Sequence, residues 1–416
     1  MKRPLLILGG LILVGLIAAG GVFYWKQLRG AGPALSPATG DIAGDIETVP
    51  KPQEHGEATA TADVIGENTT NMPLTLPDGV SVSIFAKGLG GARDLYFAPN
   101  GTMLVSVPSD GKVLRLDPQT SGPAKPVAII EGLNQPHGLA MFCDDFDSCR
   151  LFVAETNAVR VYEYDPETSE AKNGKKILDI SGGGGHWSRS LLIHNDKLYI
   201  SIGSTCNVCR EKDEQRASVM VANLDGSEAR VYAKGLRNAV FLAENPQTND
   251  VWVTEMGRDL LGDNIPPEEL NILKDGGNYG WPNCYGNNIH DAAFDKNTYI
   301  RNPCMEPFET APAVEMQAHS APLGLAFFPP EWPKEYRDDA LVAFHGSWNR
   351  TTPTGYKLRR IKLDAKGRVE GQDDFVTGWL NAKNEALGRP VDVLFYGKDL
   401  YVSDDKAGVV YLFRAP

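Results

Sequence analysis

Histidine and arginine residues recur just before short apolar segments along this chain. Arg93, His137 and His186 each stand shortly before such a segment. Imidazole has a pKa near neutral pH and suits proton transfer, whereas a guanidinium group offers a planar fork of donors that matches a carboxylate. If folding gathers these loops in one place, the chain can bind an anionic group and move a proton beside it.

The apolar segments come in pairs, and each pair ends in another polar loop. The six pairs are 95–97 with 103–107, 139–142 with 151–154, 191–193 with 198–202, 240–242 with 251–254, 323–328 with 340–344, and 391–395 with 400–402. Four-stranded units repeated about every 40–50 residues are typical of a β-propeller. The sequence therefore predicts an all-β fold, a six-bladed β-propeller over residues 73–416.

The expected propeller explains how distant polar loops meet. In each blade, the loop before the inner strand and the loop after the second strand lie on one face around a central channel. Polar loops on a rigid scaffold commonly form a binding or catalytic site. Ordinary polar turns are the alternative, but these loops carry Arg and His where Gly, Asn or Asp would suffice. Segment 80–85 alternates like a strand, and we expect it to pair with 409–413 and close the ring.

Composition supports a packed domain and excludes one class of partner. The 416-residue chain is 42% hydrophobic and 23% charged, and its 43 Gly and 28 Pro favour many short strands. Its net charge is -12 and its pI about 5.2, which argues against a nucleic-acid partner. A neutral small molecule is compatible with this charge.

The N-terminus predicts export and membrane attachment. Lys2 and Arg3 precede an uncharged run over 4–25, which is long enough to span a bilayer. We expect residues 1–29 to form a transmembrane helix, with a cleaved signal segment as the alternative. Residues 30–72 are rich in small and acidic residues and predict a flexible linker. The expected location is a bacterial inner membrane with the propeller in the periplasm, or a secreted or periplasmic protein if cleavage occurs.

Six cysteines support an oxidising location. They form three local pairs, Cys143 with Cys149, Cys206 with Cys209, and Cys284 with Cys304. An even count after an export segment favours disulfides, although six cysteines allow 15 pairings. For the second pair, a metal knuckle or redox dithiol is the alternative. The chain has no second CxxC and no His after Cys209, so zinc and c-type haem sites are disfavoured.

Four motifs of this chain occur together in one known family. They are Gly-Asn-Tyr-Gly-Trp-Pro at 277–282, Gly-Leu-Arg-Asn at 235–238, His-Gly-Ser-Trp-Asn-Arg at 345–350 and Gly-Arg-Pro at 388–390. With them the chain resembles the glucose/sorbosone dehydrogenase family over 76–414, and within it the sorbosone and pyranose dehydrogenase branch. The resemblance implies a six-bladed propeller that uses pyrroloquinoline quinone (PQQ) and Ca2+. It also implies oxidation of a sugar or sugar aldehyde, with electrons passed to a quinone pool or a soluble carrier.

The resemblance assigns roles to particular residues. His186 matches the base that takes a hydroxyl proton, and neutral imidazole suits that task. The residues expected to hold PQQ, by match or by position in the same ring of loops, are Arg93, Arg237, Asn238, His319, His345, Arg350, Lys357 and Arg389. The carbonyl groups of Gly257 and Arg258 match the calcium donors, and Arg258 stands where some relatives have proline. Arg350 and Lys357 are alternatively solvated surface charges, and His319 and His345 are alternatively core residues.

Two other functions fit a six-bladed propeller. A calcium-dependent lactonase would need acidic metal ligands near the axis and no arginine cradle. A non-enzymatic binding propeller would display a polar face to a protein or glycan and would need no quinone.

Overall fold

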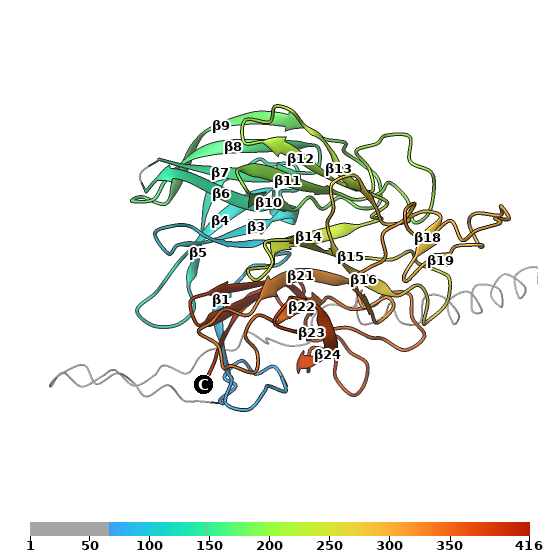
Figure 1. Ribbon diagram of the computed structural model, residues 1–416. Coiled ribbons are helices and arrows are strands. Elements are labelled where there is room, and N and C mark those ends of the chain that lie inside the picture. The colour runs from blue at the N-terminus through green and yellow to red at the C-terminus, as the bar shows by residue number, and fades with distance from the viewer. Residues whose placement is uncertain (1–65, 147) are drawn as a thin grey trace, which may run out of the picture.

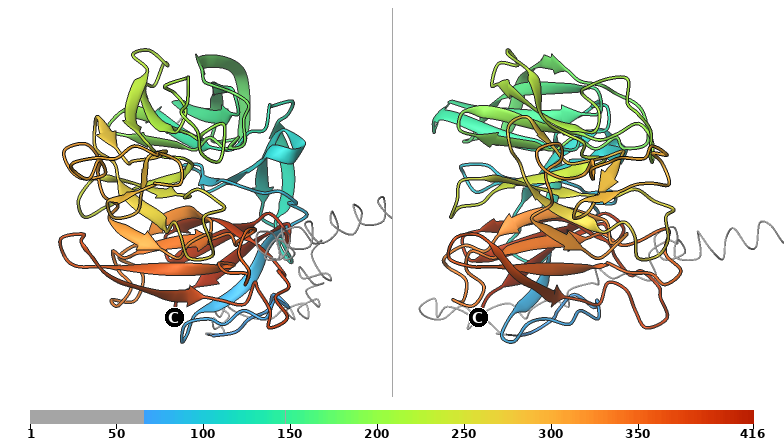
Figure 2. Two further views of the ribbon diagram at one scale, coloured as in Figure 1. Left: turned by 90° about the vertical axis from the view of Figure 1, so that its right-hand side faces the viewer. Right: turned by 45° about the vertical axis from the view of Figure 1, so that its right-hand side comes forward.

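The computed structural model describes residues 66–146 and 148–416 and shows an all-β, six-bladed propeller (Figure 1). The six sheets surround a common axis, as the left view of Figure 2 shows. The predicted fold class is confirmed. No helix within the described ranges is long and apolar enough to cross a membrane. The transmembrane helix expected at 1–29 lies outside these ranges.

Each blade is a four-stranded antiparallel sheet whose first strand lies innermost. Blade 1 holds β2 (Leu95–Phe97), β3 (Met103–Val107), β4 (Lys112–Asp117) and β5 (Lys125–Ile130). Blade 2 holds β6 (Leu139–Asp145), β7 (Ser148–Glu155), β8 (Ala158–Asp165) and β9 (Glu170–Asp179). Blade 3 holds β10 (Leu191–His194), β11 (Lys197–Ile202), β12 (Ser218–Asn223) and β13 (Arg230–Lys234), and β17 (Gly277–Asn278) adds a parallel edge strand.

The remaining blades complete the ring. Blade 4 holds β14 (Ala239–Glu244), β15 (Val251–Glu255), β16 (Glu268–Ile272) and β20 (Val314–Met316). Blade 5 holds β21 (Pro322–Phe327), β22 (Ala340–Phe344), β23 (Lys357–Leu363) and β24 (Val369–Val376). Blade 6 holds β25 (Pro390–Tyr396), β26 (Asp399–Asp404), β27 (Val409–Arg414) and β1 (Ser81–Lys87). The short hairpin of β18 (Cys284–Tyr285) and β19 (Ile289–His290) belongs to an insertion between β17 and β20.

The ring closes as the sequence predicts. β1 pairs with the C-terminal strand β27 in antiparallel register, with Val82 opposite Phe413. Residues ahead of β1 also pack on the body, since Thr70 and Met72 are each 1% exposed. The packed body therefore includes residues that the sequence assigns to the linker.

Hydroxyl groups on the second strands fix where the inner strands begin. In four blades a Ser or Thr oxygen accepts an N–H from the neighbouring inner strand or the residue just before it: Asp94 to Ser106, Ser190 to Ser201, Phe241 to Thr254, and Asp392 to Ser403. Three of these hydroxyls also donate to a carbonyl of the next blade: Ser201 to Val240, Thr254 to Leu323, and Ser403 to Arg93. Because these bonds lie at the entry of the inner strands, they also hold the polar loops just before them.

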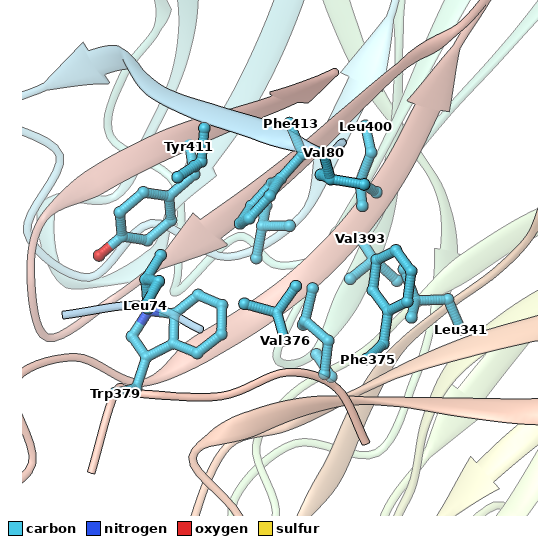
Figure 3. Close-up of a cluster of buried hydrophobic side chains, with 14 of the residues drawn as sticks. Leu74, Val80, Leu341, Phe375, Val376, Trp379, Val393, Leu400, Tyr411 and Phe413 are labelled. Atoms are coloured by element: carbon cyan, nitrogen blue, oxygen red, sulfur yellow. The ribbon is translucent and has the colours of Figure 1, made fainter. Parts of the chain in front are cut away.

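Apolar side chains fill the spaces between blades. Figure 3 shows the cluster between blades 5 and 6, where Trp379, Tyr411 and Phe413 pack with Leu74 and Val376. Burial of one large apolar side chain stabilises a fold by about 1.5–3 kcal/mol. Such clusters keep the blades rigid, so the loops at their ends keep fixed relative positions.

The cysteine prediction is confirmed for all three pairs. Disulfides join Cys143 to Cys149, Cys206 to Cys209, and Cys284 to Cys304. The first links the paired strands β6 and β7, and the third ties the insertion that carries β18 and β19. The second closes a four-residue ring in the loop after β11.

Candidate active site

His186 lies in the loop that precedes β10, and its ring is held from one side. Its Nδ1 atom lies 3.0 Å from the carbonyl oxygen of Ser204 and 2.9 Å from Ser204 Oγ. When Nδ1 carries the proton and donates to this carbonyl, Nε2 keeps its lone pair. Burial and the neighbouring charge of Arg237 lower the pKa of His186 to about 3. The imidazole is therefore neutral at physiological pH and can accept a proton at Nε2.

A close approach of backbone sets the position of this ring. A Cβ atom added to Gly203 would lie 2.5 Å from His186 Cβ and 2.7 Å from Asn238 Oδ1. Two buried arginines hold the loop on the other side: Arg189 donates to the His186 carbonyl at 2.9 Å, and Arg216 to the Gly183 carbonyl at 2.7 Å. Burial and the nearby Arg216 lower the pKa of Arg189 to about 9. Both guanidinium groups donate hydrogen bonds to backbone carbonyls and thereby hold the loop around His186 in place.

Arg237, at the entry of β14, uses all its donor groups within the protein. Its Nε and Nη2 donate to the backbone oxygen and Oδ1 of Asn207, each at 2.9 Å. Its Nη1 donates to the Gly257 carbonyl at 2.8 Å, and Nη2 also forms a 2.8 Å ion pair with Asp259. The side chain is only 3% exposed. The next residue, Asn238, donates its backbone N–H to the Glu255 carboxylate.

A second charged cluster joins blades 5, 6 and 1. Asp405 forms a 3.0 Å ion pair with Arg93, and its two oxygens each lie 3.0 Å from His345 Nε2. Arg389 lies beside them and donates to the carbonyls of His345 and Gly346, at 3.1 and 2.9 Å. Burial and Arg389 lower the pKa of His345 to about 4. Burial alone would raise the pKa of Asp405, but His345 and the two arginines hold it below its usual range.

Aromatic contacts connect the two clusters. The Arg93 guanidinium lies over the Trp187 ring, 5.8 Å from its centroid. Trp187 follows His186 in the chain, and its ring contacts that of His137 with centroids 5.9 Å apart. Through these contacts and Arg237, loops from all six blades form one polar surface around the axis.

The structure gathers most of the predicted site residues, and these form the two linked clusters. The gathered residues are Arg93, His186, Arg237, Asn238, His345 and Arg389. His319 and Arg350 instead support a nearby loop, since His319 Nε2 lies 2.7 Å from the Gly262 carbonyl and Arg350 donates to the Asp263 carbonyl. Lys357 lies on the third strand of blade 5 and forms a 2.8 Å ion pair with Asp374.

Several site residues were not singled out as candidates from the sequence. Asp405 and Trp187 stand in the polar loops of their blades, so the repeat pattern could have marked them. Ser204 follows the segment 198–202 directly, so the repeat could have marked it too, whereas nothing in the type or spacing of Asn207 indicates its role. Their importance comes from contacts with Arg237 and His186.

The donor set fits a planar anionic cofactor such as PQQ. Among the described residues, Arg93 Nε and Asn238 Oδ1 are buried without a hydrogen-bond partner. An unpaired buried donor or acceptor is costly, and a bound polar ligand can satisfy it. Arg389 is only half-buried and could face a carboxylate. The residues that would hold PQQ are therefore Arg93, Asn238 and Arg389, with Arg237 fixed beside them.

Calcium fits this arrangement less well. The Gly257 carbonyl, one of the two expected donors, already accepts from Arg237. A carbonyl oxygen has a second lone pair, but a cation there would share it with a guanidinium. In the part of the chain that the structure describes, the one group of side chains close enough to share a metal is Cys206, Cys209 and Glu211. The two sulfur atoms of that group are joined in a disulfide.

The fold and the arginine-rich polar face define a propeller of the quinoprotein type. Residues 74–415 match the family model described as TrAA12-like, and the chain belongs to this family. The predicted resemblance to the PQQ-dependent sugar dehydrogenases is thereby confirmed at the level of the family.

Curated relatives carry related names. The chain is 25% identical to a "Pyrroloquinoline quinone-dependent sugar dehydrogenase" of Hypocrea jecorina over 336 residues, covering 67% of this chain and 76% of that one. It is 23% identical to a "Pyrroloquinoline quinone-dependent pyranose dehydrogenase" of Coprinopsis cinerea over 406 residues, covering 82% and 54%. An uncharacterized protein of Borreliella burgdorferi is 34% identical over 222 residues, covering 52% and 57%. The chain thus spans little more than half the length of two of these relatives.

Solved structures confirm the architecture. A calcium structure of the Trichoderma reesei family AA12 protein superposes with a TM-score of 0.71 at 22% identity, covering 84% of this chain and 100% of that one. The holo PQQ domain of Coprinopsis cinerea pyranose dehydrogenase gives a TM-score of 0.68 at 21% identity, covering 82% and 97%. At this identity the likeness establishes the fold.

Proposed function

We propose that this protein is a PQQ-dependent sugar dehydrogenase that oxidises a sugar or sugar aldehyde of the aldose, pyranose or sorbosone type. The observation that carries the proposal is the fixed His186 ring, whose Nε2 lone pair is left beside a cluster of arginines. Family membership and the names of the relatives support the same reaction class.

In this proposal the protein groups bind, orient and move a proton. Arg93, Asn238 and Arg389 hold the carboxylates and carbonyls of the cofactor. His186 Nε2 takes the hydroxyl proton of the sugar, and Ser204 keeps the ring in the required tautomer. Bound PQQ would supply the acceptor for the hydride that leaves the carbon bearing this hydroxyl group.

The low pKa of His186 couples the base to the cofactor site. Burial contributes most to lowering it, and the charges of Arg237, Arg189 and Arg216 add to this effect. Carboxylates of a cofactor bound nearby would offset the part that comes from these cations and so raise the pKa of His186. The base would then be strongest when the site is loaded, which suits a general base working near neutral pH.

Three parts of the proposal rest on the sequence and the family. They are the calcium requirement, the electron acceptor, which is a quinone pool or a soluble carrier, and the membrane anchor at residues 1–29. The experiment adds PQQ to the full chain, with Ca2+ or with a chelator. It measures PQQ binding by fluorescence and dye reduction with a panel of aldoses, pyranoses and sorbosone. Absence of PQQ binding with and without Ca2+ would refute the proposal, whereas binding that resists the chelator would remove calcium from it.

A further inference from the structure

The four-residue ring closed by Cys206 and Cys209 lies directly between the two functional side chains of blades 3 and 4. On one side, Ser204 Oγ donates to the Cys206 carbonyl at 2.7 Å, and the same hydroxyl contacts His186 Nδ1. On the other side, Asn207 contacts Arg237. The ring therefore contacts Arg237 directly, through two hydrogen bonds of Asn207, and reaches the proposed base through Ser204.

Asn207 makes five hydrogen bonds from inside this ring. Its Oδ1 accepts from Arg237 Nη2 at 2.9 Å and from the Asp259 N–H at 2.7 Å. Its backbone oxygen accepts from Arg237 Nε at 2.9 Å and from Trp281 Nε1 at 3.3 Å. Its Nδ2 donates to the Asp259 carbonyl at 3.1 Å. One residue thus fixes the guanidinium of Arg237 and the loop that carries Gly257.

The disulfide restricts the backbone that carries Asn207. A cross-link between residues three positions apart leaves few backbone conformations for the two residues between them. Asn207 cannot move away from Arg237 without opening the ring or straining it. The Cys143–Cys149 disulfide, by contrast, joins two paired strands of blade 2, and its Cys149 sulfur lies near the carbonyl groups of Asp145 and Phe146.

We propose that Asn207, held by the Cys206–Cys209 ring, is a positioning residue for the cofactor site: it sets the direction of the Arg237 guanidinium and the path of the 256–259 loop. This inference rests on the proposed function, since it assigns Asn207 a task in PQQ binding. Asn207 reaches the cofactor only through Arg237, so removing its side chain should change cofactor affinity more than turnover.

The test compares Asn207→Ala with Val208→Ala, a matched change in the same ring that removes no hydrogen bond. For both full-length proteins, PQQ affinity is measured by fluorescence titration, kcat at saturating PQQ, and the melting temperature without PQQ. Loss of a hydrogen bond to a charged group corresponds to a weakening of about 10- to 100-fold. We expect a Kd for PQQ raised by this factor in Asn207→Ala, a smaller loss of kcat, and wild-type behaviour in Val208→Ala.

A second variant opens the ring and keeps Asn207. The double change Cys206→Ser with Cys209→Ser should weaken PQQ binding in the same direction, by a smaller factor. Equal PQQ affinity in the wild type, Asn207→Ala and the double variant would overturn the inference and leave the proposed function intact. A lowered melting temperature with unchanged affinity would also overturn it, because the ring would then act on stability alone. Absence of PQQ binding by the wild type would instead refute the proposed function.

Discussion

The two sides of the polar face use the same residue types in opposite ways. On the side of blades 3 and 4, Arg189, Arg216 and Arg237 donate to backbone carbonyls, to Asn207 and to Asp259. On the side of blades 5, 6 and 1, Arg93 keeps a buried Nε without a partner among the described residues, and Arg389 meets two carbonyls. The first side is a rigid frame around His186, and the second retains donors for an anionic ligand.

The largest effect should come from the base. His186→Ala removes the proton acceptor and leaves the arginines in place, so PQQ should still bind. Turnover should fall by about 10²–10⁴-fold, the usual range for a general base. Steady-state kinetics at saturating PQQ and a PQQ titration measure the two quantities. His290→Ala, a change on the insertion where His290 pairs with Asp295, serves as the control. Turnover within the wild-type range in His186→Ala would remove His186 from the mechanism.

The arginines of the two sides should differ in what their loss disturbs. Arg389→Ala should weaken PQQ binding by about 10- to 100-fold. The melting temperature should change little, because Arg389 is half-buried, donates to two backbone carbonyls and lies over the Tyr356 ring without a direct ion pair. Arg237→Ala should lower both the affinity for PQQ and the melting temperature. It leaves the partly buried Asp259, 17% exposed, without its cation, and loss of a hydrogen bond to a charged group costs about 1.5–3 kcal/mol. Excess PQQ should restore part of the activity of both variants and none in His186→Ala. Equal thermal destabilisation by the two changes would erase the distinction between the two sides.

The sequence predicts the scaffold better than the site because the two depend on different distances along the chain. An apolar segment such as 103–107 can be recognised from the sequence of one blade alone, and β3 has those bounds. The Arg93–Asp405 pair joins residues 312 positions apart, and nothing local to either residue signals its partner. The loop positions of Arg93, His186 and Arg389 follow from the repeat, whereas the supporting roles of His319, Arg350 and Lys357 follow only from contacts. A motif includes Arg350, whereas His319 and Lys357 were predicted from their places in the blades. The structure shows each of the three bonded to other groups of the protein.

A smaller effect should follow from crowding the rigid frame. Gly203→Ala places a Cβ 2.5 Å from His186 Cβ, closer than real atoms approach, so the His186 ring must shift. Misplacement of a catalytic group by about 1 Å can cost about 100-fold in rate, and we expect a loss of kcat of about 10- to 100-fold. Gly185→Ala is the matched control, because its added Cβ meets only the Thr205 carbonyl at 3.6 Å. Rate measurements on both variants at saturating PQQ test this. Similar rates in the two variants would show that the residues around His186 can shift to accommodate the added Cβ atom without displacing the ring.

The smallest effect concerns two carboxyl groups below the second side of the face. Asp94 and Asp392 lie at a cavity of about 750 Å3 that the inner strands line, and they link blades by accepting the N–H groups of Leu139 and Leu95. Burial raises the pKa of Asp392 to about 7, and burial together with the charge of Asp392 raises that of Asp94. The folded protein therefore holds a proton that the unfolded chain releases above its ordinary pKa near 4.

This difference fixes the sign of a pH dependence. Because the folded state binds more protons between about pH 4 and 7, this contribution to stability is present at low pH and is lost as pH rises through 7. Asp392→Asn cannot titrate, so its melting temperature should fall less than that of the wild type between pH 5 and pH 7.5. Asp364→Asn is the control: its arginine partner, Arg368, lowers the pKa of Asp364 to about 2, so its titration lies below this window. Parallel melting curves for the wild type and Asp392→Asn across the window would show that the aspartate pair stays ionised in the fold. The Asp94–Asp392 pair would then carry one more negative charge near Arg93 than we infer. That charge would lower the affinity of this side of the face for an anionic cofactor.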